Sequence, residues 1–180
     1  VHRGRIFVES SVGKGTTFWF TAQFEKHAGP PTHPPLITRE LADTRMLIVD
    51  DNATNCLICR HQLSSWQVKS ESVNSAAEAL AELRRHAGTN TAYGIALLDM
   101  HMPGVDGITL AREIRKDPGL SAVRLLLLSS SAHSLKPEEL HAAGISAALL
   151  KPVRQSQLHA ALLHLVNKHP ETAASGLPPP

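Results

Sequence analysis

This sequence contains a recurring pattern in which a short apolar run ends in polar residues. Four such segments follow one another: LIVDD, IALLDMHMPGVDG, LLLLSSS and LLKP. Their polar ends are Asp50 with Asp51, Asp99, Ser129 and Lys151. Apolar runs without alternation are typical of parallel strands that are covered on both faces. Because the carboxyl ends of such strands border one crevice, we expect these five side chains to lie close together.

Strand and helix patterns alternate through most of the sequence. We expect strands at Met46–Asp50, Val68–Val73, Ile95–Asp99, Val123–Ser129 and Ala147–Leu150. We expect helices at Ala53–Ser65, after a Ser75 cap, at Ile108–Lys116, at Pro137–Ala143, and around the apolar face of Leu158, Ala161, Leu162 and Leu165. Five strand–helix units with short connections predict an α/β fold, a doubly wound parallel sheet with helices on both faces.

The segments outside this alternation differ in composition. Residues 1–26 hold two β-rich runs around Gly13-Lys14-Gly15, which predicts a β-hairpin. A hairpin is marginal alone and should belong to a larger sheet. Residues 27–44 contain four prolines, which predicts an extended linker. Residues 169–180 are rich in small residues and proline, and we expect a second linker or a tail.

The three acidic residues have a chemical consequence if they meet. Closely spaced carboxylates repel, and one gains a proton unless a cation lies between them. Mg²⁺ is a hard cation that prefers oxygen ligands and keeps several waters. Taken singly, Asp51 could be a helix cap and Asp99 a solvated loop residue. Together with Ser129 and Lys151, they indicate a cation site beside a phosphoryl-transfer site.

Composition excludes several classes of protein. The net charge is +2, and the basic residues are scattered rather than gathered in a stripe, so we expect no nucleic-acid partner. No apolar stretch approaches the roughly 20 residues that span a membrane, and no signal peptide is visible. Cys56 and Cys59 lack a second cysteine pair. We expect reduced core thiols in a cytoplasmic compartment.

With these strand-end residues, the segment from Arg45 to Lys168 resembles the receiver domain of two-component response regulators. The Asp99–Ser129 and Ser129–Lys151 spacings are typical of that family as well. The resemblance implies a flavodoxin-like (βα)5 fold over residues 45–168, with strand order 2-1-3-4-5. It also implies that Asp99 accepts a phosphoryl group from phosphohistidine, with Ser129 and Lys151 binding phosphoryl oxygens. Mg²⁺ would be bound directly by Asp51, Asp99 and the backbone carbonyl of His101, and by Asp50 mainly through water. A cis Lys151–Pro152 bond is expected as well.

Three positions bear on how this receiver would work. Ser129 stands where the family usually has threonine, and it keeps the hydroxyl. Ala148 stands where the family usually has an aromatic residue that swings inward on phosphorylation. We therefore hypothesise a phosphoryl way-station rather than an aromatic-gated switch. His101 and Ser131 follow Asp99 and Ser129 by two residues, where the family lines the site's entrance, and we hypothesise that His101 shapes water access.

The N-terminal segment GRIFVESSVGKGTTFWFTAQFEK resembles the C-terminal end of the ATP-binding domain of a sensor histidine kinase. Gly13 and Gly15 match its last glycine-rich box, although an ordinary hairpin turn is an alternative. A P-loop is excluded, because Lys14 is followed by glycine rather than serine or threonine. The resemblance implies part of a hybrid sensor histidine kinase, with no complete kinase site in this segment. The parent would be anchored in the inner membrane, with this part in the cytoplasm.

The expected partners are the phosphohistidine of a histidine kinase or phosphotransfer domain and the chain's own kinase core, with no direct membrane contact. One alternative is a module that docks on its kinase independently of phosphorylation. Another is a magnesium-dependent phosphatase with an aspartate nucleophile. That class needs a second aspartate two residues after the nucleophile, where this chain has His101.

Overall fold

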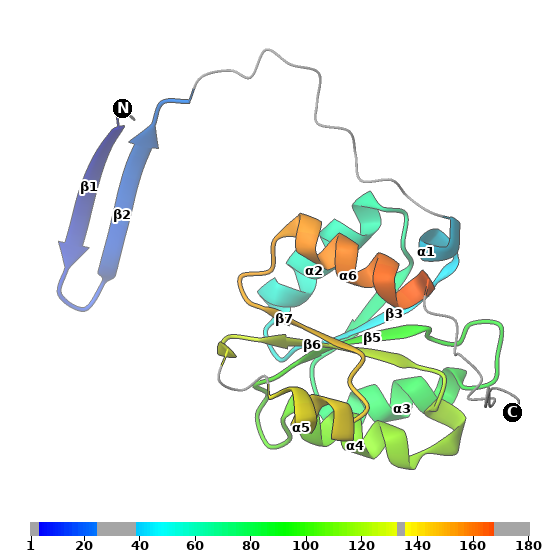
Figure 1. The fold of residues 1–180 in the computed structure, drawn as a ribbon. Coiled ribbons are helices and arrows are strands. Elements are labelled where there is room, and N and C mark those ends of the chain that lie inside the picture. The colour runs from blue at the N-terminus through cyan, green and yellow to red at the C-terminus, as the bar shows by residue number, and fades with distance from the viewer. Residues whose placement is uncertain (1–3, 25–38, 133–135, 168–180) are drawn as a thin grey trace, which may run out of the picture. The chain divides into compact units, whose positions relative to one another are not determined.

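The computed structural model describes residues 4–24, 39–132 and 136–167, which fall into two units. The first unit is the expected hairpin, with antiparallel strands β1 (Gly4–Ser11) and β2 (Gly15–Ala22) (Figure 1). Gly13 and Gly15 adopt positive φ angles of 77° and 91° in and after the turn. That conformation strains residues with a Cβ atom, which explains glycine at these positions.

The hairpin carries one strongly apolar face. Ile6 pairs with Phe20 and Val8 with Phe18. Residues directly opposite each other on antiparallel strands point to the same face. All four are more than half exposed. An apolar face of this kind normally packs against further protein.

The second unit contains one five-stranded parallel sheet in the order β4-β3-β5-β6-β7. Its strands are β3 (Met46–Val49), β4 (Ser70–Val73), β5 (Ile95–Asp99), β6 (Arg124–Ser129) and β7 (Ala147–Leu150). Counted along the chain from β3, this is the predicted order 2-1-3-4-5. The doubly wound fold is therefore confirmed.

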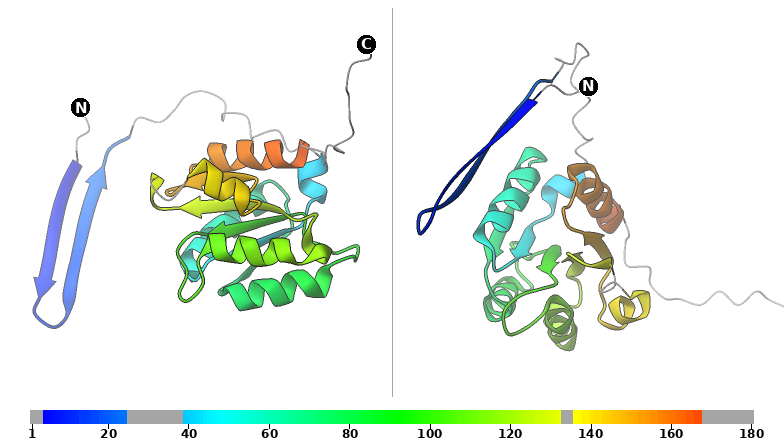
Figure 2. Two further views of the ribbon diagram at one scale, coloured as in Figure 1. Left: turned by 60° about the horizontal axis from the view of Figure 1, so that its bottom comes forward. Right: turned by 90° about the vertical axis from the view of Figure 1, so that its left-hand side faces the viewer.

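Helices cover both faces of the sheet (Figures 1 and 2). One face carries α1 (Arg39–Asp43), α2 (Ala53–Ser65) and α6 (Gln155–Asn167); the other carries α3 (Ala76–His86), α4 (Gly107–Lys116) and α5 (Pro137–Ala142), with a short 3-10 turn at Pro118–Leu120. The strands β3 and β5 are buried along their whole length. Their side chains alternate between two apolar cores, one under each helical layer.

The predicted linker over residues 27–44 is wrong at its end. Residues 39–43 form α1, which contacts α6, and Leu41 is fully buried. The prolines stop at Pro35, so nothing prevents a helix here. Residues 27–38 and the predicted tail, 169–180, lie outside the described residues. None of the helices in the described part of the chain has the length and hydrophobicity needed to cross a bilayer.

Candidate functional site

The carboxyl ends of four strands bring the predicted side chains together. Asp50 follows β3, Asp99 ends β5, Ser129 ends β6, and Lys151 follows β7. Asp50, Asp99 and Ser129 are at most 6% exposed. Buried polar groups are costly unless they are bonded or charge-compensated, so the contacts around each of them show how the site is built.

Three carboxylates form an acidic cluster. Oxygen atoms of Asp50, Asp51 and Asp99 all lie within 4.8 Å of one another, and Asp51 is exposed to solvent. This donor set consists of hard oxygen atoms, with one side open to water. It fits the preference of Mg²⁺ for a few carboxylates plus several waters.

Lys151 compensates the negative charge of this cluster. Its ammonium nitrogen lies 2.8 Å from Oδ2 of Asp50 and 2.9 Å from Oδ1 of Asp99. Burial lowers the pKa of Lys151, but the hydrogen bonds and charges of the two aspartates outweigh it, and the net shift is upward. The amine is therefore held in its charged form, in contact with both buried carboxylates.

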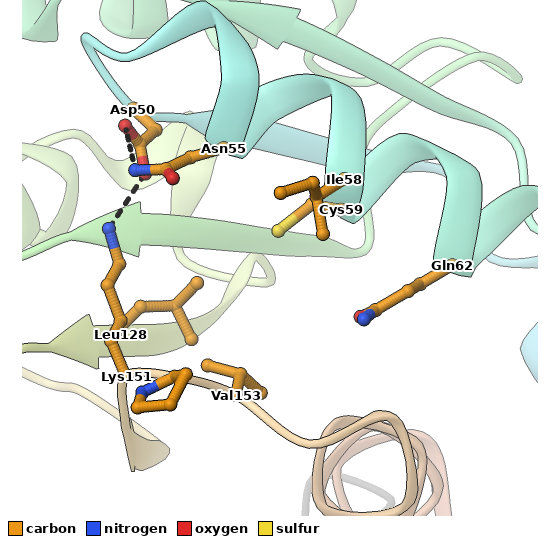
Figure 3. A pocket seen from close by; sticks show the side chains of 9 residues that line it. Asp50, Asn55, Ile58, Cys59, Gln62, Leu128, Lys151 and Val153 are labelled. Carbon is orange, nitrogen blue, oxygen red and sulfur yellow. Dashed lines mark hydrogen bonds and ion pairs between the residues drawn. The ribbon is translucent and has the colours of Figure 1, made fainter. Parts of the chain in front are cut away.

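Asp50 is the most extensively bonded member of the site. The backbone N–H of Asn52 donates to Oδ1 at 2.9 Å, and the side-chain Nδ2 of Asn55 lies 3.2 and 3.1 Å from the two carboxylate oxygens. Figure 3 shows Asn55 and Lys151 next to Asp50, Asn55 from helix α2 and Lys151 from the end of β7. Asn55 was not among the site residues predicted from the sequence. Its position in the first turn of the helix that follows Asp50 was the available signal.

Ser129 lies at the end of β6, as predicted, and its hydroxyl group bonds the backbone of Ser131. Its Oγ donates to the carbonyl of Ser131 at 3.0 Å and accepts from the N–H of Ser131 at 3.1 Å. The carbonyl of Ser129 accepts from the N–H of Lys151 at 2.7 Å, which joins the ends of β6 and β7. The hydroxyl residue and the lysine are thus linked through the backbone.

The loop after Asp99 is closely packed. A Cβ atom on Gly107 would lie 2.4 Å from the carbonyl oxygen of Asp99, so only glycine fits there. Asp106 caps α4 by accepting from the N–H of Thr109 at 2.7 Å. His101, in the same loop, is exposed. The predicted cis Lys151–Pro152 bond is also present.

A pocket of about 410 Å³ adjoins the acidic cluster (Figure 3). Asp50, Asn55 and Lys151 line its polar end, and Ile58, Cys59 and Val153 line its apolar part. Cys56 is buried and Cys59 is partly buried, and both are free thiols. Burial raises the pKa of Cys59 to about 11, which keeps it protonated near neutral pH.

Comparison with known proteins gives the same result as the geometry. Residues 46–163 match the response regulator receiver domain. Autoinducer 2 sensor kinase/phosphatase LuxQ of Vibrio vulnificus is 31% identical over 165 residues, covering 89% of this chain and 19% of that protein. Virulence sensor protein BvgS of Bordetella bronchiseptica is 30% identical over 188 residues, covering 98% of this chain and 14% of that protein. The chain thus spans less than a fifth of either relative.

Solved structures add a comparison of the fold. The receiver domain of sensor histidine kinase PA1611 from Pseudomonas aeruginosa, with a magnesium ion coordinated in its active site cleft, is 25% identical. The match has a TM-score of 0.61 and covers 69% of this chain and 98% of that one. From the sheet order, the strand-end cluster and these similarities, it follows that this chain belongs to the response regulator receiver family.

Proposed function

We propose that this chain accepts a phosphoryl group from a phosphohistidine onto Asp99, in a Mg²⁺-dependent step of a two-component phosphorelay. The observation that carries the proposal is the contact of buried Asp99 with Lys151 beside two further carboxylates. A buried nucleophile, a charged amine and a set of hard ligands are the parts that phosphoryl transfer to a carboxylate requires.

In this reaction a carboxylate oxygen of Asp99 attacks phosphorus, the P–N bond of the phosphohistidine breaks, and the imidazole leaves. The ammonium group of Lys151 already forms a salt bridge with Asp99, so it can pair with an oxygen of the incoming phosphoryl group. Ser129 would exchange its bond to Ser131 for one to another phosphoryl oxygen. Hydrogen bonds to charged groups are worth about 1.5–3 kcal/mol each, enough to favour this rearrangement.

Asp51 and Asp99 would hold Mg²⁺ directly and Asp50 mainly through water, with the backbone carbonyl of His101 added by resemblance. When bound, the ion neutralises charge on the carboxylates and on the phosphoryl oxygens. The magnesium in the cleft of the PA1611 receiver domain supports this assignment. His101, exposed in the loop after Asp99, would limit access of water to the phosphoaspartate. An unchanged dephosphorylation rate in His101→Ala would refute that role.

The partner would approach along the first half of α2. Leu57 and Ile58 are 67% and 51% exposed there, and Ile58 also lines the pocket beside Asp50. A helix carrying a phosphohistidine must bring its imidazole to Asp99, so its neighbouring apolar residues would cover this surface. The donor would be a phosphotransfer domain or the chain's own kinase core.

The parent protein would be a hybrid sensor histidine kinase, anchored in the inner membrane, with this part in the cytoplasm. The similarity to BvgS extends over 98% of the chain and so includes the hairpin. In this proposal the hairpin is the end of the kinase ATP-binding domain, and the rest of that domain covers the apolar face of Ile6, Val8, Phe18 and Phe20. Residues 27–38 would be the linker to the receiver.

The decisive experiment is intact-mass measurement after incubation with acetyl phosphate, with and without Mg²⁺. We expect wild type to gain one phosphoryl group only with Mg²⁺, and Asp99→Asn to gain none. If wild type gains nothing even from a phosphorylated donor protein, the domain is instead a docking module that acts without phosphorylation. Binding to the kinase core that ignores phosphorylation would then be the finding to look for.

A further inference from the structure

The bonds around Asp50 single out Asn55. Both carboxylate oxygens of Asp50 lie 3.1–3.2 Å from one atom, Nδ2 of Asn55. An ionised carboxylate only accepts hydrogen bonds, so the NH₂ group of the amide must be the part that faces it. A donor that sits opposite both oxygens fixes the plane of the carboxylate as well as its position.

Asn55 is itself held in place by the start of α2. The side chain of Asn52 caps this helix and accepts from the N–H groups of Thr54 and Asn55, at 2.9 and 3.4 Å. The N–H of Asn52 donates to Asp50 as well. The first turn of α2 therefore acts as one rigid support, which presents a backbone donor and an amide donor to the same carboxylate.

Asp50 shares its cationic partner, Lys151, with Asp99. Lys151 contacts both Asp50 and Asp99, and in the proposed reaction its ammonium turns toward the phosphoryl group. Asp50 then loses part of that contact, while the bonds from Asn55 stay. Asn55 is also neutral, so it satisfies the buried carboxylate without cancelling the charge that a cation needs.

From this geometry we infer that Asn55 is a positioning residue, which holds the carboxylate of Asp50 in the orientation that converges with Asp51 and Asp99 on Mg²⁺. The inference rests on the proposed function, since it assigns a role in binding the ion. Groups that orient metal-binding residues typically change metal affinity by about 10–100-fold when they are replaced. The role is indirect, because Asn55 would not touch the phosphoryl group.

The test is Mg²⁺ binding to the full chain by calorimetry, with wild type, Asn55→Leu and Gln62→Leu. Leucine has nearly the shape of asparagine but cannot donate. Gln62 lies on the same helix and lines the same pocket, and within the described residues it forms no hydrogen bond with Asp50. We expect Asn55→Leu to weaken Mg²⁺ binding about 10-fold, and Gln62→Leu to leave it within about twofold.

A second readout separates positioning from general damage to the fold. The Mg²⁺ concentration that gives half-maximal phosphorylation by acetyl phosphate should rise about 10-fold in Asn55→Leu. The maximal rate at saturating Mg²⁺ should return to that of wild type. Thermal unfolding in EDTA reports whether the variant is folded. Wild-type affinity in Asn55→Leu, or an unrecoverable rate in a folded variant, would overturn the inference. If wild type bound no Mg²⁺ at all, the proposed function would fail first.

Discussion

The ammonium nitrogen of Lys151 lies 2.9 Å from Oδ1 of Asp99, although the strand β6 separates their two strands in the sheet. The lysine side chain therefore crosses one strand to reach Asp99, the proposed nucleophile. It places a positive charge in contact with both buried carboxylates, and removing it tests how far the fold depends on that compensation.

Lys151→Met should destabilise the domain in EDTA by about 1–3 kcal/mol, because it leaves buried carboxylates without their cationic partner. Adding Mg²⁺ should raise the melting temperature of this variant more than that of wild type, since the ion replaces the missing charge. Differential scanning calorimetry with and without Mg²⁺ measures both effects. Lys116→Met is the matched control: Lys116 forms an exposed pair with Glu113, and pairs of that kind contribute at most about 1 kcal/mol. Equal responses of both variants to Mg²⁺ would contradict the assignment.

Gly107→Ala should cost about 1–3 kcal/mol and impair phosphorylation, because the new methyl group would lie against the backbone carbonyl of Asp99. Gly119→Ala is a suitable control, since its Cβ would meet no backbone atom, but only the end of the Asp117 side chain at 3.3 Å and the Cβ of Ala87 at 4.0 Å. Urea unfolding and the rate of phosphorylation by acetyl phosphate are the measurements. A stable and active Gly107→Ala protein would show that the loop after Asp99 can move away.

Phosphorylation should leave the surface over β7 and α5 largely unchanged. Ala148 lies in β7, where it is partly buried against one of the two cores, and the whole strand reads AALL. With no aromatic ring to turn inward, the phosphoryl mimic beryllofluoride should shift NMR resonances near Asp99 but few in β7 and α5. Large shifts throughout that face would contradict the way-station hypothesis. Ala148→Tyr, which introduces a ring, is the variant to compare.

The pH dependence of stability should include a contribution from Glu71. Hydrogen bonds from Arg45 and from Tyr93, the latter at 2.9 Å, hold the pKa of Glu71 below its ordinary value. A carboxyl group with a lowered folded-state pKa stabilises the fold above its unfolded-state value of about 4.5, and this is lost as the pH falls through the folded value. Because the Glu71 side chain is 49% exposed, the effect should stay below about 1 kcal/mol.

The check is urea unfolding of wild type and Glu71→Gln from roughly pH 6 to pH 3. The stability difference between them should shrink toward the acid end. A difference that is constant over this range would mean that Glu71 titrates alike in the folded and unfolded chains. Tyr93→Phe keeps the ring and its contact with Arg45 but removes the hydroxyl, so it shows how much of the effect belongs to the hydroxyl, which bonds Glu71 and also Glu82 at 2.8 Å.

The sequence was most informative where apolar runs end. A polar residue at the end of a buried parallel strand must lie at the carboxyl edge of the sheet. The positions of Asp50, Asp99 and Ser129 could therefore be predicted from the sequence. Helix α1 could not, because a single apolar anchor, Leu41, leaves no periodicity to detect. Asn55 was missed for a different reason. Asn52 already serves as the N-cap of this helix, so nothing in the sequence distinguishes Asn55 from a solvent-facing asparagine, and only the tertiary structure shows that its amide faces a carboxylate.

The reach of Lys151 has one more consequence. It follows β7, an edge strand that pairs with β6, whereas the aspartates it contacts lie at the carboxyl ends of the inner strands β3 and β5. A side chain that starts at the edge of the sheet thus contacts two carboxylates near its centre. When that charge changes, the flexible side chain of Lys151 can turn to a new partner while β7 keeps its place in the sheet, so a chemical event at the centre need not move the rim.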